Sequence, residues 1–331
     1  MHRRTILTVG LCTPERRRYA GEISAALGQP VVTASAAPPR LRDRLLLSAL
    51  EAARNAGDAI VVDTPPGVDL PALLDAGDGE VVCVVDARHM LDDLQGSAPL
   101  APREHARDDR GDIGARARHA AHLIESASGV VIVDWEDTPT EDLSMMMAIV
   151  SHLNPGCRIR LSRNAVEDLR ALAAGTTAPP WRERAGWVHA LNGEHAPFMR
   201  DPRVSTLRYE QLRPFQPARL MHALDRIDAG VCGTVVRSVG FCRLATRPGV
   251  LARWEQAGSA MWLDPLDDDE GWRATVQEIA LTGIDLDAAD LTRRLDAAAL
   301  TDAELAAGPE SWLRGADPLP PWPATIDEPG A

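Results

Sequence analysis

The chain has 331 residues, of which 45% are apolar and only 4% aromatic, so two domains with aliphatic cores are expected. Its formal net charge of −13 argues against a nucleic-acid backbone or an anionic membrane as the main partner. All 35 basic residues are arginine, and the chain contains no lysine. This excludes chemistry that needs a compact ammonium group, because arginine is a poor substitute at a tight point-charge site.

Five cysteines lie far apart in the sequence, with no CxxC pair among them. An odd, sparse set without an export signal predicts reduced thiols in a cytoplasmic protein. The apolar run 6–11 is too short for the core of a signal peptide, and no stretch approaches the length of a transmembrane helix.

The first half of the chain alternates short apolar runs with helical stretches. Helices are predicted over 19–27 and 41–56, and strands over 5–11, 31–34, 59–62, 81–85 and 130–133. Short, continuously apolar strands separated by helices are typical of a parallel sheet that is covered on both faces. Asp63, Asp86 and Asp134 follow three of these strands, at the edge where open α/β sheets bind their ligands.

The pattern changes in the second half. A polar loop is expected over 96–114, and the Gly- and Pro-rich segment 174–181 predicts a boundary between domains 1–175 and 182–331. Beyond it, strands are predicted over 204–210, 231–244, 260–263 and 278–282, and helices over 217–227 and 288–300. Strands and helices without strict alternation indicate an α+β domain, followed by a Pro-rich tail from Asp317.

The loop after the first strand lacks the features of a phosphate-binding loop. Such a loop needs glycines, whose backbone N–H groups approach the phosphates, and a lysine for the β and γ charges. Here Gly10 is followed by Pro14, which has no N–H, and by Glu15, which would repel phosphate. Arg16–Arg18 could form a residual anion site, but a solvated run of charge is the favoured interpretation.

The string Asp63-Thr-Pro-Pro-Gly67 has two interpretations. After an apolar strand it is similar to the acidic strand end that holds Mg²⁺ through water beside a phosphate, and the same string occurs in MinD- and Mrp-like ATPases. Those ATPases need a Gly- and Lys-rich loop near the start of the chain, which is missing here. The alternative is a tight Pro-Gly turn that ends a strand.

Longer strings resemble the CobW family over nearly the whole chain, most closely after residue 200. They are 81–94, 109–113, 123–134, Asn154-Pro-Gly156, 204–209, Arg213-Pro-Phe215, 240–248, 254–258 and 300–304. The resemblance implies an α/β fold class: a P-loop-NTPase-like parallel sheet with helices on both faces, plus a smaller α+β CobW C-terminal domain. The first would be a degenerate GTPase-like domain over 1–175, and the second would occupy 182–331.

The motifs of that family are degenerate in this chain. Its guanine motif, Asn-Lys-x-Asp, stands here as Asp134-Trp-Glu-Asp137, so only the final aspartate remains. Asp63 and Asp137 are therefore the vestigial Mg²⁺ and guanine positions. The family's Cys-x-Cys-Cys metal motif has no counterpart in 31–62, and the histidine that usually follows Arg-Pro-Phe is Gln216.

A metal site elsewhere is predicted from spacing. His119, His122 and Glu125 follow one another at i, i+3 steps, so on a helix they share one face and offer zinc ligands. The alternative is a solvated polar face. His189 and His195 fall where some family members carry His-rich loops, but two histidines are a weak remnant. Small core residues are expected at two of the cysteines, Cys232 and Cys242.

The sequence thus predicts a CobW-like protein of metal homeostasis, with zinc as the expected metal, that handles metal or binds a partner without hydrolysing GTP. A metalloprotein client is the implied partner, and Mg²⁺-GTP is not expected to bind. Two alternatives stay open. One is an active GTP-binding metallochaperone GTPase in which Arg16–Arg18 replace the lysine, and the other is a Mrp- or MinD-like ATPase.

Overall fold

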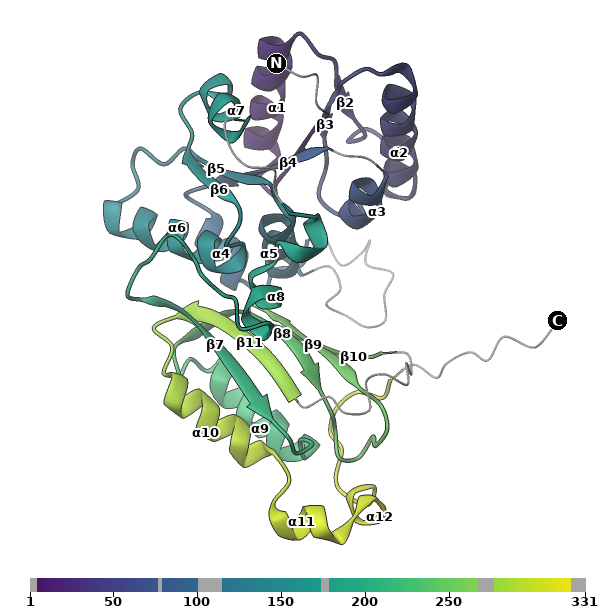
Figure 1. Cartoon of the computed structure of the whole chain (residues 1–331), viewed down its shortest axis with the longest axis vertical. Coiled ribbons are helices and arrows are strands. Elements are labelled where there is room, and N and C mark those ends of the chain that lie inside the picture. The colour runs from purple at the N-terminus through teal and green to yellow at the C-terminus, as the bar shows by residue number, and fades with distance from the viewer. Residues whose placement is uncertain (1–4, 77–78, 101–114, 174–178, 267–276, 323–331) are drawn as a thin grey trace, which may run out of the picture. The chain divides into compact units, whose positions relative to one another are not determined.

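The structure is a computed structural model that describes residues 5–76, 79–100, 115–173, 179–266 and 277–322. The chain divides into two compact units, one of Met1–Ser205 with Ala257–Ala260 and one of Thr206–Gln256 with Met261–Ala331 (Figure 1). The predicted domain limits, 1–175 and 182–331, stay predictions. Residues 101–114 of the predicted loop, 174–178 of the predicted boundary and 323–331 of the tail lie outside the described residues.

The first unit is built on a six-stranded parallel sheet with the strand order β2-β3-β1-β4-β5-β6. The strands are β1 Ile6–Val9, β2 Val31–Thr33, β3 Val61–Asp63, β4 Glu80–Asp86, β5 Gly129–Val133 and β6 Arg158–Leu161. Five of them are the predicted apolar runs. The sixth was not predicted, because arginine alternates with apolar residues along it and its side chains are only partly buried.

Helices lie on both sides of this sheet, as predicted. They are α1 Thr13–Leu27, α2 Pro39–Ala56, α3 Leu70–Asp75, α4 Met90–Gln95, α5 Arg116–Ser126, α6 Thr140–Leu153, α7 Ala165–Ala173 and α8 Gly186–Leu191, with a short 3₁₀ turn at Trp181–Glu183. Figure 1 shows α1 and α7 on one side of the strands, and α4 and α5 on the other. None of the helices within the described ranges is both long and apolar enough to cross a lipid bilayer.

The first helix begins earlier than predicted. It starts at Thr13 instead of near Tyr19, because Pro14 sits in its first turn, where the missing N–H has no partner to lose. It ends at Gly28, which takes the left-handed conformation that caps a helix. The consequence is that Arg16–Arg18 belong to a helix directly after β1, and only Gly10–Cys12 connect the two elements.

Gly10 itself is required by the sheet. Its φ is +150°, and a Cβ at this position would lie 2.3 Å from the carbonyl oxygen of Val84 on the neighbouring strand β4. A side chain therefore cannot be accommodated where the chain leaves β1. The one glycine of the loop is therefore needed where the backbone leaving β1 passes close to the backbone of β4.

The second unit is an α+β structure, as predicted. Its five-stranded sheet has the order β10-β9-β8-β11-β7, and β8 and β11 run antiparallel. The strands are β7 Val204–Gln211, β8 Thr234–Cys242, β9 Ala252–Ala257, β10 Ala260–Pro265 and β11 Gln277–Ile284, and the helices are α9 Pro217–Asp228, α10 Ala288–Ala298, α11 Asp302–Ala307 and α12 Pro309–Trp312. The sequence prediction missed β9, α11 and α12.

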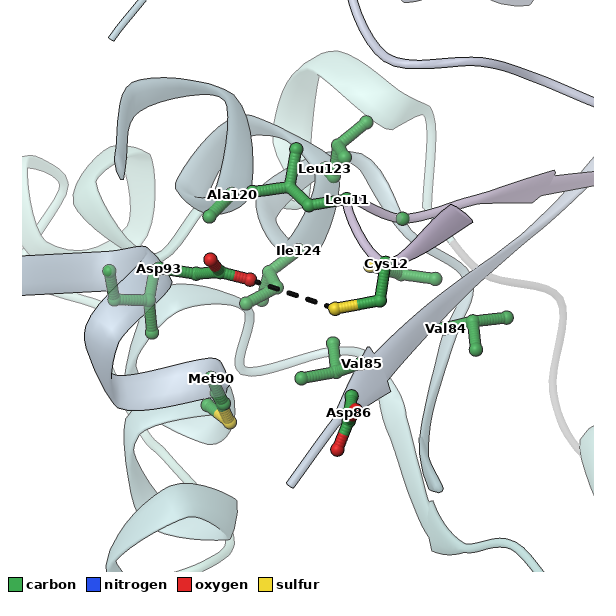
Figure 2. Close-up of a pocket in the computed structure, with 13 residues that line it drawn as sticks. Leu11, Cys12, Val84, Val85, Asp86, Met90, Asp93, Ala120, Leu123 and Ile124 are labelled. Atoms are coloured by element: carbon green, nitrogen blue, oxygen red, sulfur yellow. Dashed lines mark hydrogen bonds between the residues drawn. The ribbon is translucent and has the colours of Figure 1, made fainter. Parts of the chain in front are cut away.

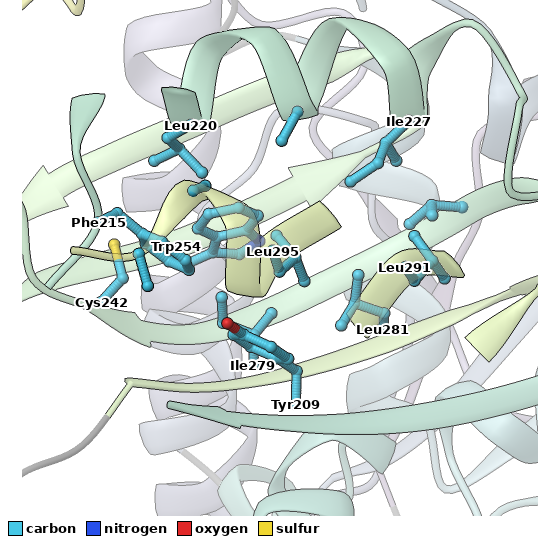
Figure 3. Packing of buried hydrophobic residues seen from close by; sticks show 14 of the residues in the cluster. Tyr209, Phe215, Leu220, Ile227, Cys242, Trp254, Ile279, Leu281, Leu291 and Leu295 are labelled. Atoms are coloured by element: carbon cyan, nitrogen blue, oxygen red, sulfur yellow. The ribbon is translucent and has the colours of Figure 1, made fainter. Parts of the chain in front are cut away.

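The core of this unit is centred on Trp254, which is fully buried beside Phe215 and Leu295 (Figure 3). The ring centres of Phe215 and Trp254 are 6.2 Å apart. Cys232 and Cys242 belong to the same cluster and are fully buried, which confirms the prediction that they are small core residues. All five cysteines of the chain are free.

Candidate functional site

Four neighbouring strands of the first unit end at one edge of the sheet. β1, β3, β4 and β5 are adjacent and parallel, so the residues after them share that edge. Asp63, Asp86 and Asp134 lie there with the connection Gly10–Cys12. This is the place where open α/β sheets bind ligands, and the order of the strands confirms the predicted gathering of the three aspartates.

Arg16 fills the space between the end of β1 and the end of β3. Its side chain is fully buried, its Nε donates to Asp63 Oδ1 at 2.6 Å, and its Nη1 donates to the Gly10 carbonyl at 2.8 Å. The favoured interpretation of Arg16–Arg18 as a solvated run is therefore wrong for its first member. The early start of α1 turns Arg16 toward the sheet, where a carboxylate and a carbonyl compensate for part of its lost hydration. Its Nη2 is buried and has no hydrogen-bond partner among the described residues.

The remaining oxygen of Asp63 is also occupied. Its Oδ2 accepts a hydrogen bond from Thr33 Oγ1 at 3.0 Å and lies 3.6 Å from Arg17 Nε. The Asp63 side chain is only 3% exposed. The vestigial Mg²⁺ position predicted from the sequence is thus a buried carboxylate whose partners are supplied by the protein itself.

The other two arginines of the run are more exposed. Arg17 is 54% exposed, and Arg18, which is 52% exposed, donates from Nη2 to Asp134 Oδ1 at 3.0 Å. Arg16 and Arg18 thus hydrogen-bond two of the three strand-end aspartates. The positive charges of these two arginines are thus paired with carboxylates of the protein itself.

The vestigial guanine position is open. Asp137 is 90% exposed, and Arg88 Nη2 lies 3.9 Å from its Oδ2. Trp135, two residues before it, donates from its indole N–H to the Ser162 carbonyl at 3.0 Å, and the Arg163 guanidinium lies 5.0 Å from its ring centre. A role for Asp137 in reading a base remains a prediction.

A thiol and two carboxylates converge at the same edge. Within the described parts of the chain, Cys12, Glu15 and Asp86 form a group whose ligand atoms all lie within 4.8 Å of one another. The Cys12 sulfur also lies 4.0 Å from Asp93 Oδ2, as Figure 2 shows. Sulfur and carboxylate oxygen are both zinc ligands. The sequence prediction missed this group, although Cys12 and Asp86 follow neighbouring strands.

The environment of Cys12 keeps its thiol protonated. Burial raises its pKa to about 11, and the carboxylates of Asp93, Asp86 and Glu15 add to the effect, while Arg116 opposes it. The sulfur lies at the wall of a small pocket whose apolar side includes Met90, Leu123 and Ile124. A metal ion bound here would have to displace the thiol proton, so its affinity would rise with pH.

The zinc ligands predicted from spacing all lie on α5. His119 and His122 are partly buried, and Glu125 is 6% exposed, so Glu125 does not belong to a solvated face. Their ligand atoms do not converge within 4.8 Å as those of the Cys12 group do. The site of His119, His122 and Glu125 therefore stays a prediction.

A histidine pair was not anticipated. His195 Nε2 lies 3.4 Å from Nδ1 of His152, a residue in the last turn of α6 that the sequence did not single out. Burial lowers the pKa of His152 to about 4, with a further contribution from His195, and burial also lowers the pKa of His195. Both rings are therefore neutral at pH 7, the form in which imidazole binds metals.

Gln216 has a structural role where the family usually carries histidine. It precedes α9, and its side-chain oxygen accepts a hydrogen bond from the Arg219 backbone N–H at 2.7 Å. Glutamine thus caps the helix, as an acceptor side chain at this position should. The residue contributes to the fold of the second unit.

A comparison with known protein families identifies a match in the second unit. Residues 204–299 match the cobalamin synthesis protein CobW C-terminal domain. Most of the second unit is thus similar to a CobW C-terminal domain. The resemblance to the CobW family expected from the sequence is thereby confirmed.

Curated relatives extend the CobW similarity into the first unit. A zinc-regulated GTPase metalloprotein activator of Dictyostelium discoideum is 25% identical over 270 residues, which are 72% of this chain and 55% of the relative. A zinc chaperone of Mycobacterium tuberculosis is 26% identical over 282 residues, 77% of this chain and 64% of the relative. The chain spans less than two thirds of the length of these CobW-like relatives.

Among solved structures, the Zn(II)-bound YjiA GTPase from E. coli is similar at a TM-score of 0.35 and 10% identity, with 89% of this chain and 98% of that chain covered.

Proposed function

We propose that this CobW-like protein handles a zinc-class metal ion in metal homeostasis and does not turn over GTP. The names of two relatives support the first part, since one is a zinc chaperone and the other is a zinc-regulated activator of metalloproteins. The buried pair of Arg16 and Asp63 supports the second part, and it is the observation on which the proposal mainly depends.

The residues at the edge of the sheet do not fit Mg²⁺-GTP. A magnesium ion held through water at Asp63 would have to lie beside the Arg16 guanidinium, which already neutralises that carboxylate at 2.6 Å. Displacing the guanidinium would leave a buried charge without its partner, at a cost of about 3–5 kcal/mol. Phosphoryl transfer depends almost entirely on positioning and charge neutralisation, and both are lost here.

The backbone offers no cradle for phosphates either. Gly10 is held against Val84 of β4, and α1 begins only three residues later with Pro14 in its first turn. Glu15 adds a carboxylate to that turn, where a phosphate would need a donor. The negative charge of Glu15 therefore offsets the attraction that the helix N-terminus would otherwise exert on a phosphate.

An active GTPase in which Arg16–Arg18 replace the lysine is the competing proposal. Arg16 is unavailable for it, because its contacts with Asp63 and Gly10 hold it in the core. Arg18 would first have to leave Asp134. The Mrp- or MinD-like ATPase is disfavoured by the CobW C-terminal domain.

The partner proposed is a metalloprotein client that receives or surrenders the metal. The proposal follows from the name of the Dictyostelium relative and carries no claim about which client it is.

Phosphate release tests the absence of turnover. The purified full chain is incubated with GTP and Mg²⁺, with and without zinc, beside Asp63→Ala as the matched control. The proposal expects both proteins to release phosphate at the rate of the buffer blank. Release by the unmodified chain that Asp63→Ala abolishes would overturn it.

A further inference from the structure

Two later segments of the chain are fixed to the last turn of α6. Ser151 is fully buried, and its Oγ accepts hydrogen bonds from the backbone N–H groups of Phe198 at 2.9 Å and Met199 at 3.1 Å. These bonds hold the segment that begins at His195 next to Ser151 and its neighbour His152. The two histidines therefore meet through backbone anchoring.

Helix α8 is fixed to the same turn by a close backbone contact. A Cβ on Gly186 would lie 1.9 Å from the carbonyl oxygen of His152, so only glycine fits where α8 starts. His189 lies one turn further along α8. Its Nε2 is buried and finds no hydrogen-bond partner within the described residues. An unpaired buried imidazole nitrogen costs free energy unless a ligand engages it.

The spacing of the first two rings suits a metal ion better than a hydrogen bond. The 3.4 Å between His152 Nδ1 and His195 Nε2 exceeds the usual length of about 2.7–3.2 Å for a hydrogen bond from N–H. Two nitrogens bound to one tetrahedral zinc at about 2.0–2.1 Å lie about 3.3–3.4 Å apart. The planes of the two rings are tilted by 57°, so the rings are not stacked on each other.

We propose that His152, His189 and His195 form a site for a divalent transition metal of the zinc class. His152 and His195 supply two nitrogens at the spacing of bound ligands. The ligand atoms of all three histidines do not lie within 4.8 Å of one another in the structure, so His189 has to rotate its side chain toward the pair to supply the third nitrogen. Three imidazoles leave one coordination position for water or for a ligand of a partner. Such an open site suits an ion that is passed on more than one that only holds a fold together.

This site is separate from the sheet edge that carries Asp63 and Cys12. It is also independent of whether GTP is hydrolysed, since its ligands come from α6, α8 and the segment after α8. The site deepens the metal-handling part of the proposed function and rests on that part. GTP turnover by the chain would leave the site standing, and its own test reads metal binding alone.

The test is a zinc titration of the full chain against a chromogenic chelator. The ligand variants are His195→Ala and His189→Ala, and both side chains are partly exposed in the structure. The matched control is His222→Ala, because His222 lies exposed on α9. We expect each ligand variant to bind zinc at least about 10-fold more weakly, since losing even an outer partner of a metal ligand costs about 10–100-fold. His222→Ala should match the unmodified chain.

Cobalt absorption identifies the donors. With Co²⁺ the proposal expects the visible bands of a tetrahedral nitrogen site and no thiolate charge-transfer band, and His195→Ala should lose those bands. Unchanged zinc affinity in both His195→Ala and His189→Ala, with circular dichroism showing that they fold, would overturn the proposal. So would a thiolate band that Cys12→Ser abolishes together with all of the zinc binding.

Discussion

The Arg16 guanidinium donates to the Asp63 carboxylate at 2.6 Å, and both side chains are buried beneath the first turns of α1. An internal cation thus lies at the strand end where the CobW resemblance places the vestigial Mg²⁺ position. The proposed absence of GTP turnover depends on this pair, because the guanidinium occupies the charge to which a metal–phosphate complex would bind.

Removal of Arg16 should destabilise the first unit strongly. Arg16→Ala leaves Asp63 buried without its partner, at an expected cost of about 3–5 kcal/mol in the free energy of unfolding. Arg17→Ala is the matched control, because Arg17 is 54% exposed at 3.6 Å from the same carboxylate and should cost less than about 1 kcal/mol. Urea unfolding followed by circular dichroism compares the two. Equal costs would contradict the assigned pairing.

The acid response of the second unit should depend on Glu304. Hydrogen bonds from Arg219 and then from the Thr301 backbone lower its pKa to about 2. A lowered carboxyl pKa adds stability that is complete above the ordinary value near pH 4.5 and is lost as the pH falls toward 2. Because the pair is partly exposed, the contribution to stability is modest.

NMR titration of the Glu304 carboxyl group measures this directly. In Arg219→Ala the pKa of Glu304 should rise toward 4.5, whereas Arg226→Ala, on the same helix, should leave it unchanged. An unshifted titration in Arg219→Ala would mean that the ion pair does not hold in solution.

The predicted domain 182–331 should fold alone, because it contains the whole of the second unit. Its core around Trp254 and Phe215 is formed from its own strands and helices. The isolated fragment is expected to unfold cooperatively in urea, and Trp254→Ala should lower its stability by about 3–5 kcal/mol. A fragment with no cooperative transition would count against the predicted boundary.

The zinc site predicted on α5 should be weak if it exists. Its three ligands, His119, His122 and Glu125, come from one helix and do not converge in the structure. Zinc titration of His119→Ala beside His222→Ala decides the matter. A loss of affinity in His119→Ala alone would support the site, and equal affinity in both would remove it.

The sequence predicted most of the architecture because local patterns encode it. Continuous apolar runs gave β1, β3, β4 and β5, and Gly57 marked the end of α2. The pattern failed at β6, where Arg158 and Arg160 interrupt the apolar run, and at α1, where an arginine run seemed solvated. Arg16 is buried because its partner, Asp63, lies at the end of β3. No local sequence pattern reveals that these two residues are in contact.

The two candidate metal sites were missed for the same reason. Cys12 and Asp86 meet only because β1 and β4 are neighbours, and His152 meets His195 only because Ser151 and Gly186 fix two segments to one helical turn. Their residue types are visible in the sequence, but their proximity is a property of the fold. The one signal in the sequence was that Cys12 and Asp86 each follow a predicted strand, 5–11 and 81–85.

Thermal denaturation with millimolar Mg²⁺-GTP tests the central claim most directly. A ligand present at a hundred times its dissociation constant stabilises the native state by about 2.7 kcal/mol. For a domain of roughly 150–250 residues this raises the melting temperature by about 5–10 °C. The buried pair of Arg16 and Asp63 predicts a shift near zero. A clear upward shift that Asp63→Ala or Asp137→Ala abolishes would show that the nucleotide site still works.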